Sequence, residues 1–153
     1  LSGTILDNIV AASPERDRNR VESLLRRIDA WDWIASRPGG LEARVGERGL
    51  NFSVGERQLI AFVRALYQDR PILLLDEATS SMDSETEARV QRAMESLIRS
   101  RTCVVVAHRL STIRHADRIL LFQRGRILEQ GSHDELLTQN GAYARLYAQQ
   151  VEL

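Results

Sequence analysis

The sequence contains no lysine: all 21 basic residues among its 153 positions are arginines. Every mechanism that needs an amine is therefore excluded, including Schiff-base chemistry and the phosphate-binding lysine of a nucleotide-binding loop. Cysteine is almost absent as well, since Cys103 stands alone. This excludes an internal disulfide and a zinc site with several cysteines, and it suits a reducing compartment.

Long apolar runs are also missing. Runs such as Ile72 to Leu75 and Cys103 to Ala107 fall far short of the roughly 20 residues that span a bilayer. The 21 acidic residues balance the 21 basic ones, so a strongly basic nucleic-acid binder is excluded and no nucleic-acid partner is expected. With 43% hydrophobic residues the chain can form a core and should be soluble. It begins at Leu1 without a signal-like segment, so we expect a piece of a longer protein.

Residues 1 to 70 are predicted to form an α-helical subdomain. One amphipathic helix is expected to open at Ser13-Pro14 or in the charged stretch after it, and to end before Pro38. A second, well-buried helix is expected to begin near Gly55. The apolar positions that predict the two helices are Val21, Leu24, Leu25 and Ile28 in the first, and Leu59, Ile60, Val63, Leu66 and Tyr67 in the second.

Residues 71 to 153 have a different pattern. Ile72 to Leu75 and Cys103 to Ala107 are predicted to be strands covered on both faces. Between them, Ser84 and Glu87 have the spacing of a capping box, and the apolar residues after them predict a helix. A strand, a helix and a strand of these lengths form a right-handed crossover, so the two strands should be parallel.

The last forty residues predict a hairpin and two short helices. The hairpin pairs Ile119 to Phe122 with Arg126 to Glu129. The first helix is opened by Ser132 and Glu135. The second carries an apolar stripe of Tyr143, Leu146, Tyr147 and Val151.

Polar residues follow both buried strands. Asp76 and Glu77 come directly after the first strand, and His108 follows the second. Because ligands bind beyond the carboxyl ends of parallel strands, these side chains should share one edge of the sheet. A buried strand that ends in an acid needs a cation, which suggests a hydrated Mg²⁺ at Asp76, and Glu77 could then deprotonate a water. The alternative is structural: Asp76 caps a turn, Glu77 is solvated and His108 is a core histidine.

A second candidate site lies where the buried helix starts, at Ser53 to Gln58. A serine hydroxyl, a glycine and free helix N–H groups make an anion pocket. The same residues also make an ordinary helix cap, so from the residues alone both interpretations stay open.

These segments, taken in order, resemble the motifs of ATP-binding cassette (ABC) proteins over nearly the whole chain. The likeness to exporter-type cassettes includes the segment from Gly3 to Ile9 and the X-loop at Val45 to Gly49. In that family the X-loop touches the coupling helices of the membrane domain. The motifs are the X-loop at Val45 to Gly49, the signature at Ser53 to Gln58, the Walker B strand at Ile72 to Glu77, the D-loop at Ser80 to Asp83, and the histidine switch at Ala107 to Thr112.

The resemblance implies a fold of the α/β class, a partial P-loop NTPase (ABC ATPase) fold. Residues 1–70 would form the helical subdomain with the X-loop and signature, and residues 71–153 the Walker B half of a RecA-like core. In that family two cassettes sandwich two ATP molecules head to tail. The implied partners are therefore a second nucleotide-binding domain, identical or different, and a transmembrane domain reached through Val45 to Gly49.

The resemblance also assigns roles to individual residues. Asp76 would bind Mg²⁺ through water, Glu77 would activate the attacking water, and His108 would contact the γ-phosphate. Asp83 would work with His108 across the interface between cassettes. Glu56 stands where the family motif most often has glutamine, and a negative charge there would weaken an anion clamp. The residues that would clamp ATP on the partner are Ser53, Val54, Gly55 and Glu56.

The chain has no Gly-x-x-x-x-Gly-Lys-Ser/Thr motif, so by itself it is expected not to hydrolyse ATP. We also expect an exposed apolar sheet edge, with self-association or poor order around residues 71 to 108. The resemblance implies that the full-length protein is an ATPase that drives a membrane exporter from the cytoplasmic face of the cell membrane. A soluble ABC-type ATPase of DNA repair or translation is disfavoured by Val45 to Gly49, and a non-catalytic interaction module by the presence of Glu77 and His108.

Overall fold

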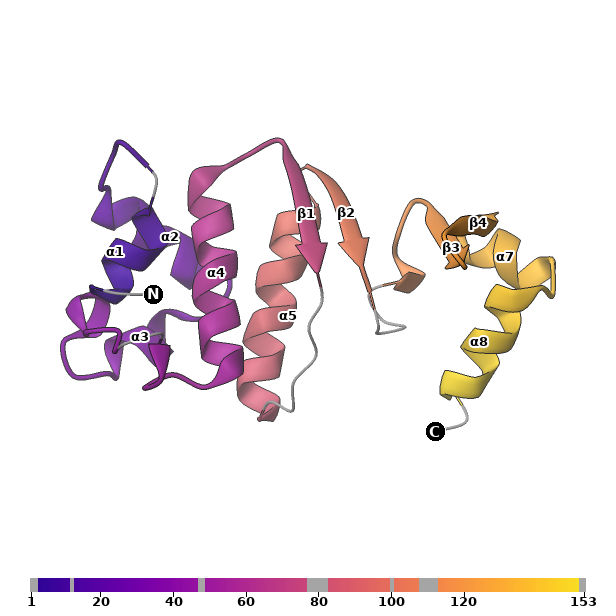
Figure 1. Cartoon of the computed structure of the whole chain (residues 1–153). Helices are drawn as coiled ribbons and strands as arrows, with labels where there is room; N and C mark the ends of the chain where they lie inside the picture. Colours follow the sequence, from indigo (N-terminus) through magenta and orange to yellow (C-terminus); the bar gives the residue numbers. More distant parts are fainter. Residues whose placement is uncertain are drawn as a thin grey trace. The chain divides into compact units, whose positions relative to one another are not determined.

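The computed structural model describes residues 3–11, 13–46, 49–76, 83–99, 101–107 and 113–151, with side chains up to residue 149. The chain forms two compact units (Figure 1). The first comprises Leu1–Leu75 and Ser80–Val104, and the second comprises Asp76–Thr79 and Val105–Leu153. Within the described ranges, no helix combines the length and apolarity needed to cross a bilayer.

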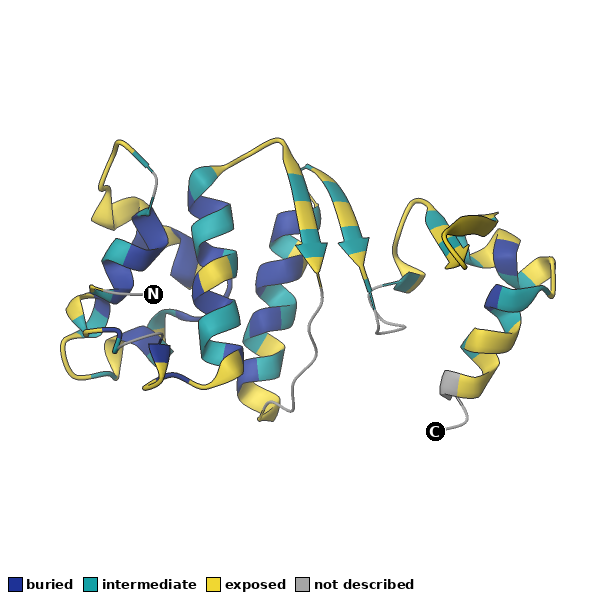
Figure 2. Ribbon diagram, in the orientation of Figure 1, coloured by how far each residue is buried: buried dark blue, intermediate teal, exposed yellow. Residues whose placement is uncertain are grey.

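The first unit is a helical layer packed around one hydrophobic core. The helix α4 lies at its centre and packs against α1, α2 and α5, and the buried faces of these helices meet in Figure 2. The helices of this unit are α1 (Ile5–Val10), α2 (Arg18–Arg27), α3 (Trp31–Ala35), the 3-10 helix η1 (Gly40–Glu42), α4 (Val54–Gln68) and α5 (Ser84–Ile98).

The first predicted helix is confirmed by α2, which starts in the charged stretch with Asp17 as its N-cap. Its expected continuation to Pro38 is wrong. Asp29 adopts a left-handed conformation with φ 56°, and the Ala30 N–H donates to the Leu25 carbonyl at 2.8 Å. This is the hydrogen-bond pattern of a Schellman motif, so the helix ends and a separate helix, α3, follows.

The second predicted helix is confirmed by α4. The helix begins at Val54, one residue before the predicted start near Gly55, and Ser53 is its N-cap. All five of the predicted apolar positions are buried. The helix ends at Asp69, which is left-handed with φ 50°. The short helix α1 has its own capping box, formed by Thr4 and Asp7, which pattern analysis did not single out.

The helix predicted between the two strands is α5, and it packs side by side with α4 (Figure 1). Its N-cap is Asp83, whose carboxylate accepts a 2.9 Å hydrogen bond from the Thr86 N–H, so the expected capping box at Ser84 and Glu87 is wrong. Aspartate and serine are comparable N-caps, and in α5 the aspartate one residue upstream of Ser84 occupies the N-cap position. The helices α4 and α5 run in the same direction, with their N-termini at the same end (Figure 1).

The two predicted strands are β1 (Ile72–Asp76) and β2 (Thr102–Val106), which pair with each other. Their arrows point the same way in Figure 1, which confirms the parallel arrangement. The prediction that both faces are covered is wrong. One face packs toward the helices, where the Cys103 Sγ contacts the Leu97 carbonyl of α5. The described residues leave the other face open, with Leu74 78% exposed and Ile72, Val104 and Val106 exposed beside it (Figure 2).

The second unit contains the predicted hairpin. The strands β3 (Ile119–Gln123) and β4 (Arg126–Gly131) pair antiparallel, with an irregularity between Leu121 and Phe122. Arg124 and Gly125 both have positive φ, 49° and 76°, as a two-residue hairpin turn requires.

Two helices follow the hairpin, α7 (His133–Thr138) and α8 (Ala142–Val151). Ser132 and Glu135 form the predicted capping box of α7. The Glu129 carboxylate accepts hydrogen bonds from the N–H groups of Ala142 and Tyr143 at the start of α8. The predicted apolar stripe of α8 is wrong in part, because Tyr143 is buried but Leu146 is exposed.

Candidate functional site

The N-terminal end of α4 is built by a capping box. The Ser53 Oγ accepts a 3.1 Å hydrogen bond from the Glu56 N–H, and the Glu56 Oε2 accepts a 2.7 Å bond from the Ser53 N–H. A serine followed three residues later by glutamate satisfies two otherwise unpaired donors of the first turn. Ser53 is exposed, so this end of the helix is open to a ligand.

Several donors at this end have no acceptor among the residues that the structure describes. The Ser53 hydroxyl uses its oxygen as an acceptor, so its hydrogen can still be donated. Among the described residues, no acceptor contacts the N–H groups of Val54 and Gly55. These groups carry the partial positive charge of the helix N-terminus, and the arrangement can therefore bind an anion.

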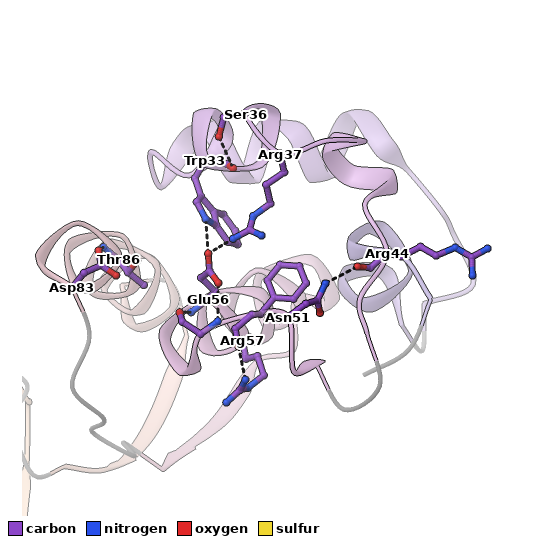
Figure 3. A network of polar contacts seen from close by, with 11 residues as sticks. Trp33, Ser36, Arg37, Arg44, Asn51, Glu56, Arg57, Asp83 and Thr86 are labelled. Carbon is purple, nitrogen blue, oxygen red and sulfur yellow. Dashed lines mark hydrogen bonds and ion pairs between the residues drawn. The ribbon is translucent and has the colours of Figure 1, made fainter.

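The Glu56 carboxylate is fully engaged within the helical unit. Besides its bond to the Ser53 N–H, its Oε1 accepts a 3.0 Å bond from the Trp33 Nε1–H and forms an ion pair with the Arg37 Nη2 (Figure 3). The negative charge of Glu56 was expected to weaken the anion clamp. The structure corrects this expectation, because Arg37 offsets the charge of Glu56 and the carboxylate accepts the Ser53 N–H of the cap.

Arg37 is held between two aromatic rings. Its guanidinium carbon lies 4.8 Å from the centre of the Trp33 ring and 4.6 Å from that of the Phe52 ring. The side chain of Arg37 is only 25% exposed and that of Glu56 17%. Such a pair is screened less by water than a surface salt bridge, and guanidinium stacking on aromatic faces adds to it.

The loop before α4 is fastened by two further polar side chains (Figure 3). Arg57 donates to the carbonyls of Gly49 and Phe52. Asn51 accepts from the Gly46 N–H at 2.8 Å and donates to the Arg44 carbonyl at 3.0 Å. These bonds tie the start of the predicted X-loop to the loop that precedes the helix, although Glu47 and Arg48 lie outside the described residues.

Asp83 lies at the matching end of the neighbouring helix, where it caps α5. Its exposed carboxylate accepts the Thr86 N–H, and that hydrogen bond lowers the pKa of Asp83 below its ordinary value. Because α4 and α5 pack side by side in the same direction, the fold brings Ser53 and Asp83 to one end of the helix pair (Figure 1). Two predicted nucleotide-contacting residues thus share one end of the first unit.

Asp76 is the last residue of β1 and is exposed. No ion pair or hydrogen bond to its side chain is present among the described residues, so the desolvation argument made from the sequence does not apply. The described ranges also contain no cluster of three metal-ligating side chains. A single free carboxylate suits Mg²⁺, which keeps most of its ligands as water or phosphate oxygens. The predicted partners Glu77 and His108 lie outside the described residues.

Sequence analysis missed the residues that support the helix end, above all Trp33 and Arg37. Trp33 also packs on the core. The spacing of Ser53 and Glu56 is a capping-box signal that could have shown where the carboxylate points. No local pattern links Arg37 to a glutamate 19 residues away.

A family model described as ABC transporter matches residues 2–80, slightly more than half of the chain. The chain belongs to the ABC transporter family. Relatives of this ABC chain include an ATP-dependent lipid A-core flippase of Burkholderia pseudomallei (strain 1710b), 50% identical over 150 residues. Another lipid A-core flippase, from Methylobacillus flagellatus, is 53% identical over 121 residues.

A solved structure described as a bacterial Atm1-family ABC exporter with ATP bound is also similar. Its TM-score is 0.83 at 42% identity, over 97% of this chain and 26% of that one. This likeness confirms the partial α/β ABC ATPase fold. The Burkholderia alignment covers 97% of this chain and 25% of the relative, and the Methylobacillus alignment covers 79% and 21%. The ABC chain thus spans about a quarter of the length of these relatives.

Proposed function

We propose that this chain is the signature and Walker B part of an ATP-hydrolysing cassette that powers a membrane exporter. The names of the similar flippases and of the Atm1-family exporter support this proposal. The observation that carries it is the end of α4, where the exposed Ser53 hydroxyl and two N–H groups without an acceptor among the described residues can bind an anion, on a motif typical of the family. Phosphate oxygens are the ligands that such a helix end favours.

In this proposal the end of α4 clamps ATP held by a second cassette. The Ser53 hydroxyl and the N–H groups of Val54 and Gly55 donate to the γ-phosphate. Glu56 stabilises the clamp from behind and does not bind the phosphate, because its carboxylate only accepts hydrogen bonds and faces the donors of Ser53 and Trp33. Preorganised donors of this kind supply placement and charge neutralisation, which phosphoryl transfer needs most.

The residues after the two strands complete the proposed site. Asp76 holds Mg²⁺ through water, and Mg²⁺ offsets charge on the phosphates. Glu77 accepts a proton from the attacking water or orients it. His108 contacts the γ-phosphate, and Asp83 acts with it across the interface between cassettes.

The proposal extends to the partners and the location of the whole protein. A second cassette, identical or different, would complete each ATP site. Residues Val45–Gly49 would contact the coupling helices of a transmembrane domain at the cytoplasmic face of the membrane. The division into a helical subdomain, 1–70, and a Walker B half, 71–153, is part of the same proposal.

ATP turnover tests the proposal in a completed cassette, made by joining this chain to the preceding part of the Burkholderia pseudomallei cassette. Glu77→Gln removes the proposed base and should lower the turnover rate by roughly 10²–10⁴-fold. Glu85→Gln is the matched control, because Glu85 is an exposed residue of α5 that pairs with Arg89. Equal rates for the wild type and Glu77→Gln would contradict the proposed role.

The exposed face of β1 and β2 gives a second test. We propose that the rest of the cassette covers Leu74, Val104 and their neighbours, since contiguous apolar patches on a sheet mark an interaction surface. The chain alone should therefore self-associate in light scattering, and Leu74→Thr with Val104→Thr should reduce that association. A wild-type chain that stays strictly monomeric would contradict this part of the proposal.

A further inference from the structure

The strongest unexplained feature of the first unit is the cluster that surrounds the Glu56 carboxylate. Three donors converge on it: the Ser53 N–H, the Trp33 indole N–H and the Arg37 guanidinium (Figure 3). A capping box needs only the first of these. The other two come from α3 and the turn after it, a segment about twenty residues earlier in the chain.

From this cluster we propose that Arg37 and Trp33 are positioning residues for the anion clamp at the end of α4. They hold the Glu56 carboxylate in the cap and offset its charge, so the donors of Ser53, Val54 and Gly55 stay available to a phosphate. This inference rests on the proposed function, because it assigns the clamp a phosphate ligand.

The charge of Arg37 offsets that of Glu56. A carboxylate in the first turn of a helix stabilises that turn, but it opposes the approach of an anion to the same N–H groups. Arg37 makes the pair neutral without withdrawing the cap, since it bonds to Oε1 while the Ser53 N–H bonds to Oε2. The motif can therefore contain glutamate and still accept a phosphate.

Stacking and hydrogen bonding also hold the Glu56 carboxylate in place. The guanidinium of Arg37 stacks against both Trp33 and Phe52, and Phe52 is the buried residue directly before the cap. Trp33 adds a neutral donor to the same carboxylate oxygen that Arg37 contacts. The position of Glu56 is thus fixed by Trp33, which packs on the core, and by Arg37, which stacks on Trp33 and on the buried Phe52.

The test measures KM and kcat for ATP in the completed cassette. Arg37→Met leaves the Glu56 charge uncompensated beside the phosphate, so KM should rise on the order of tenfold while kcat changes much less. Adding Glu56→Gln removes that charge and keeps an acceptor for the cap, so the double variant should return KM to within about threefold of the wild type. Arg18→Met is the control, because Arg18 forms exposed ion pairs with Glu22 and Glu42.

A purely structural role predicts a different outcome. Both the single and the double variant lose the packing of Arg37, so a double variant as impaired as Arg37→Met would overturn the proposal, as would an unchanged KM in Arg37→Met. If Arg37→Met does not fold, Arg37→Lys keeps the charge and loses the planar stack. A KM near the wild-type value would support the charge role, and a tenfold higher KM would overturn it.

A measurement on the chain itself needs no ATP. Trp31 and Trp33 are its only tryptophans, so NMR shows two indole N–H signals. The Trp33 signal should exchange slowly with solvent and lose that protection in Glu56→Ala. Rapid exchange in the wild type would overturn the positioning contact. The proposed function is judged separately, by the wild type and Glu77→Gln of the completed cassette.

Discussion

The helices α4 and α7 begin with the same pattern, a serine followed three residues later by glutamate. The local geometry is nearly identical, because the serine N–H to glutamate Oε2 distance is 2.7 Å at Ser53 and 2.8 Å at Ser132. Their surroundings differ. The Glu56 carboxylate also bonds to Trp33 and Arg37, whereas the Glu135 carboxylate accepts a hydrogen bond from Ser132 alone among the described residues.

This difference shows that one sequence motif can have two roles. At α7 the box only caps the start of the helix, and its glutamate is exposed. At α4 the same box is fixed by distant residues and lies on the segment that resembles the ABC signature. The additional contacts at Glu56, and not the cap itself, distinguish a supported anion site from an ordinary helix start.

The largest predicted difference between the two caps is in stability. Glu56→Ala removes the cap and leaves the sheltered Arg37 and Trp33 donors without their acceptor, so the free energy of unfolding should fall by about 2–4 kcal/mol. Glu135→Ala removes only an exposed cap, and its effect should be clearly smaller. Urea unfolding measured by circular dichroism checks both variants. Equal losses would mean that Trp33 and Arg37 add nothing to the cap.

The next prediction uses pH. A hydrogen bond from the Ser132 N–H lowers the pKa of Glu135 below its ordinary value, and the Thr4 N–H does the same to Asp7 in α1. A lowered folded-state pKa means that the stabilisation is present above the unfolded-state pKa and is lost as the pH falls through the folded-state value. The urea midpoint should therefore fall as the pH drops below about 4. Glu135→Gln should weaken this dependence, and an unchanged slope would contradict the assignment.

The smallest effect is expected at a surface pair of charges. Arg18 contacts Glu22 and Glu42 at 3.1 Å, and the side chains of Arg18 and Glu42 are about half exposed to solvent. Arg18→Met should change the free energy of unfolding by less than about 1 kcal/mol. A loss as large as that of Glu56→Ala would remove the distinction between sheltered and exposed pairs.

Sequence analysis predicted the elements whose signals are local. Apolar spacing predicted α2, α4 and α5, and short apolar runs predicted β1 and β2. The break after α2 was missed because the left-handed residue there is Asp29, not the glycine that usually marks such an end.

The other misses depend on contacts between distant segments. A continuous apolar run looks the same whether its second face is covered or open, so the exposure of Leu74 and Val104 could not be predicted. The pairing of Arg37 with Glu56 joins positions 19 residues apart and has no periodic signal. The roles of Glu77 and His108 stay predictions.

The most direct test of the anion site compares Ser53→Asp with Ser132→Asp in the completed cassette. Aspartate caps a helix as well as serine does, so both variants should fold. At position 53, however, it replaces a donor hydroxyl by a negative charge where the phosphate should bind. We predict that ATP turnover falls at least about 100-fold in Ser53→Asp and is unchanged in Ser132→Asp. Equal turnover in the two folded variants would contradict the account.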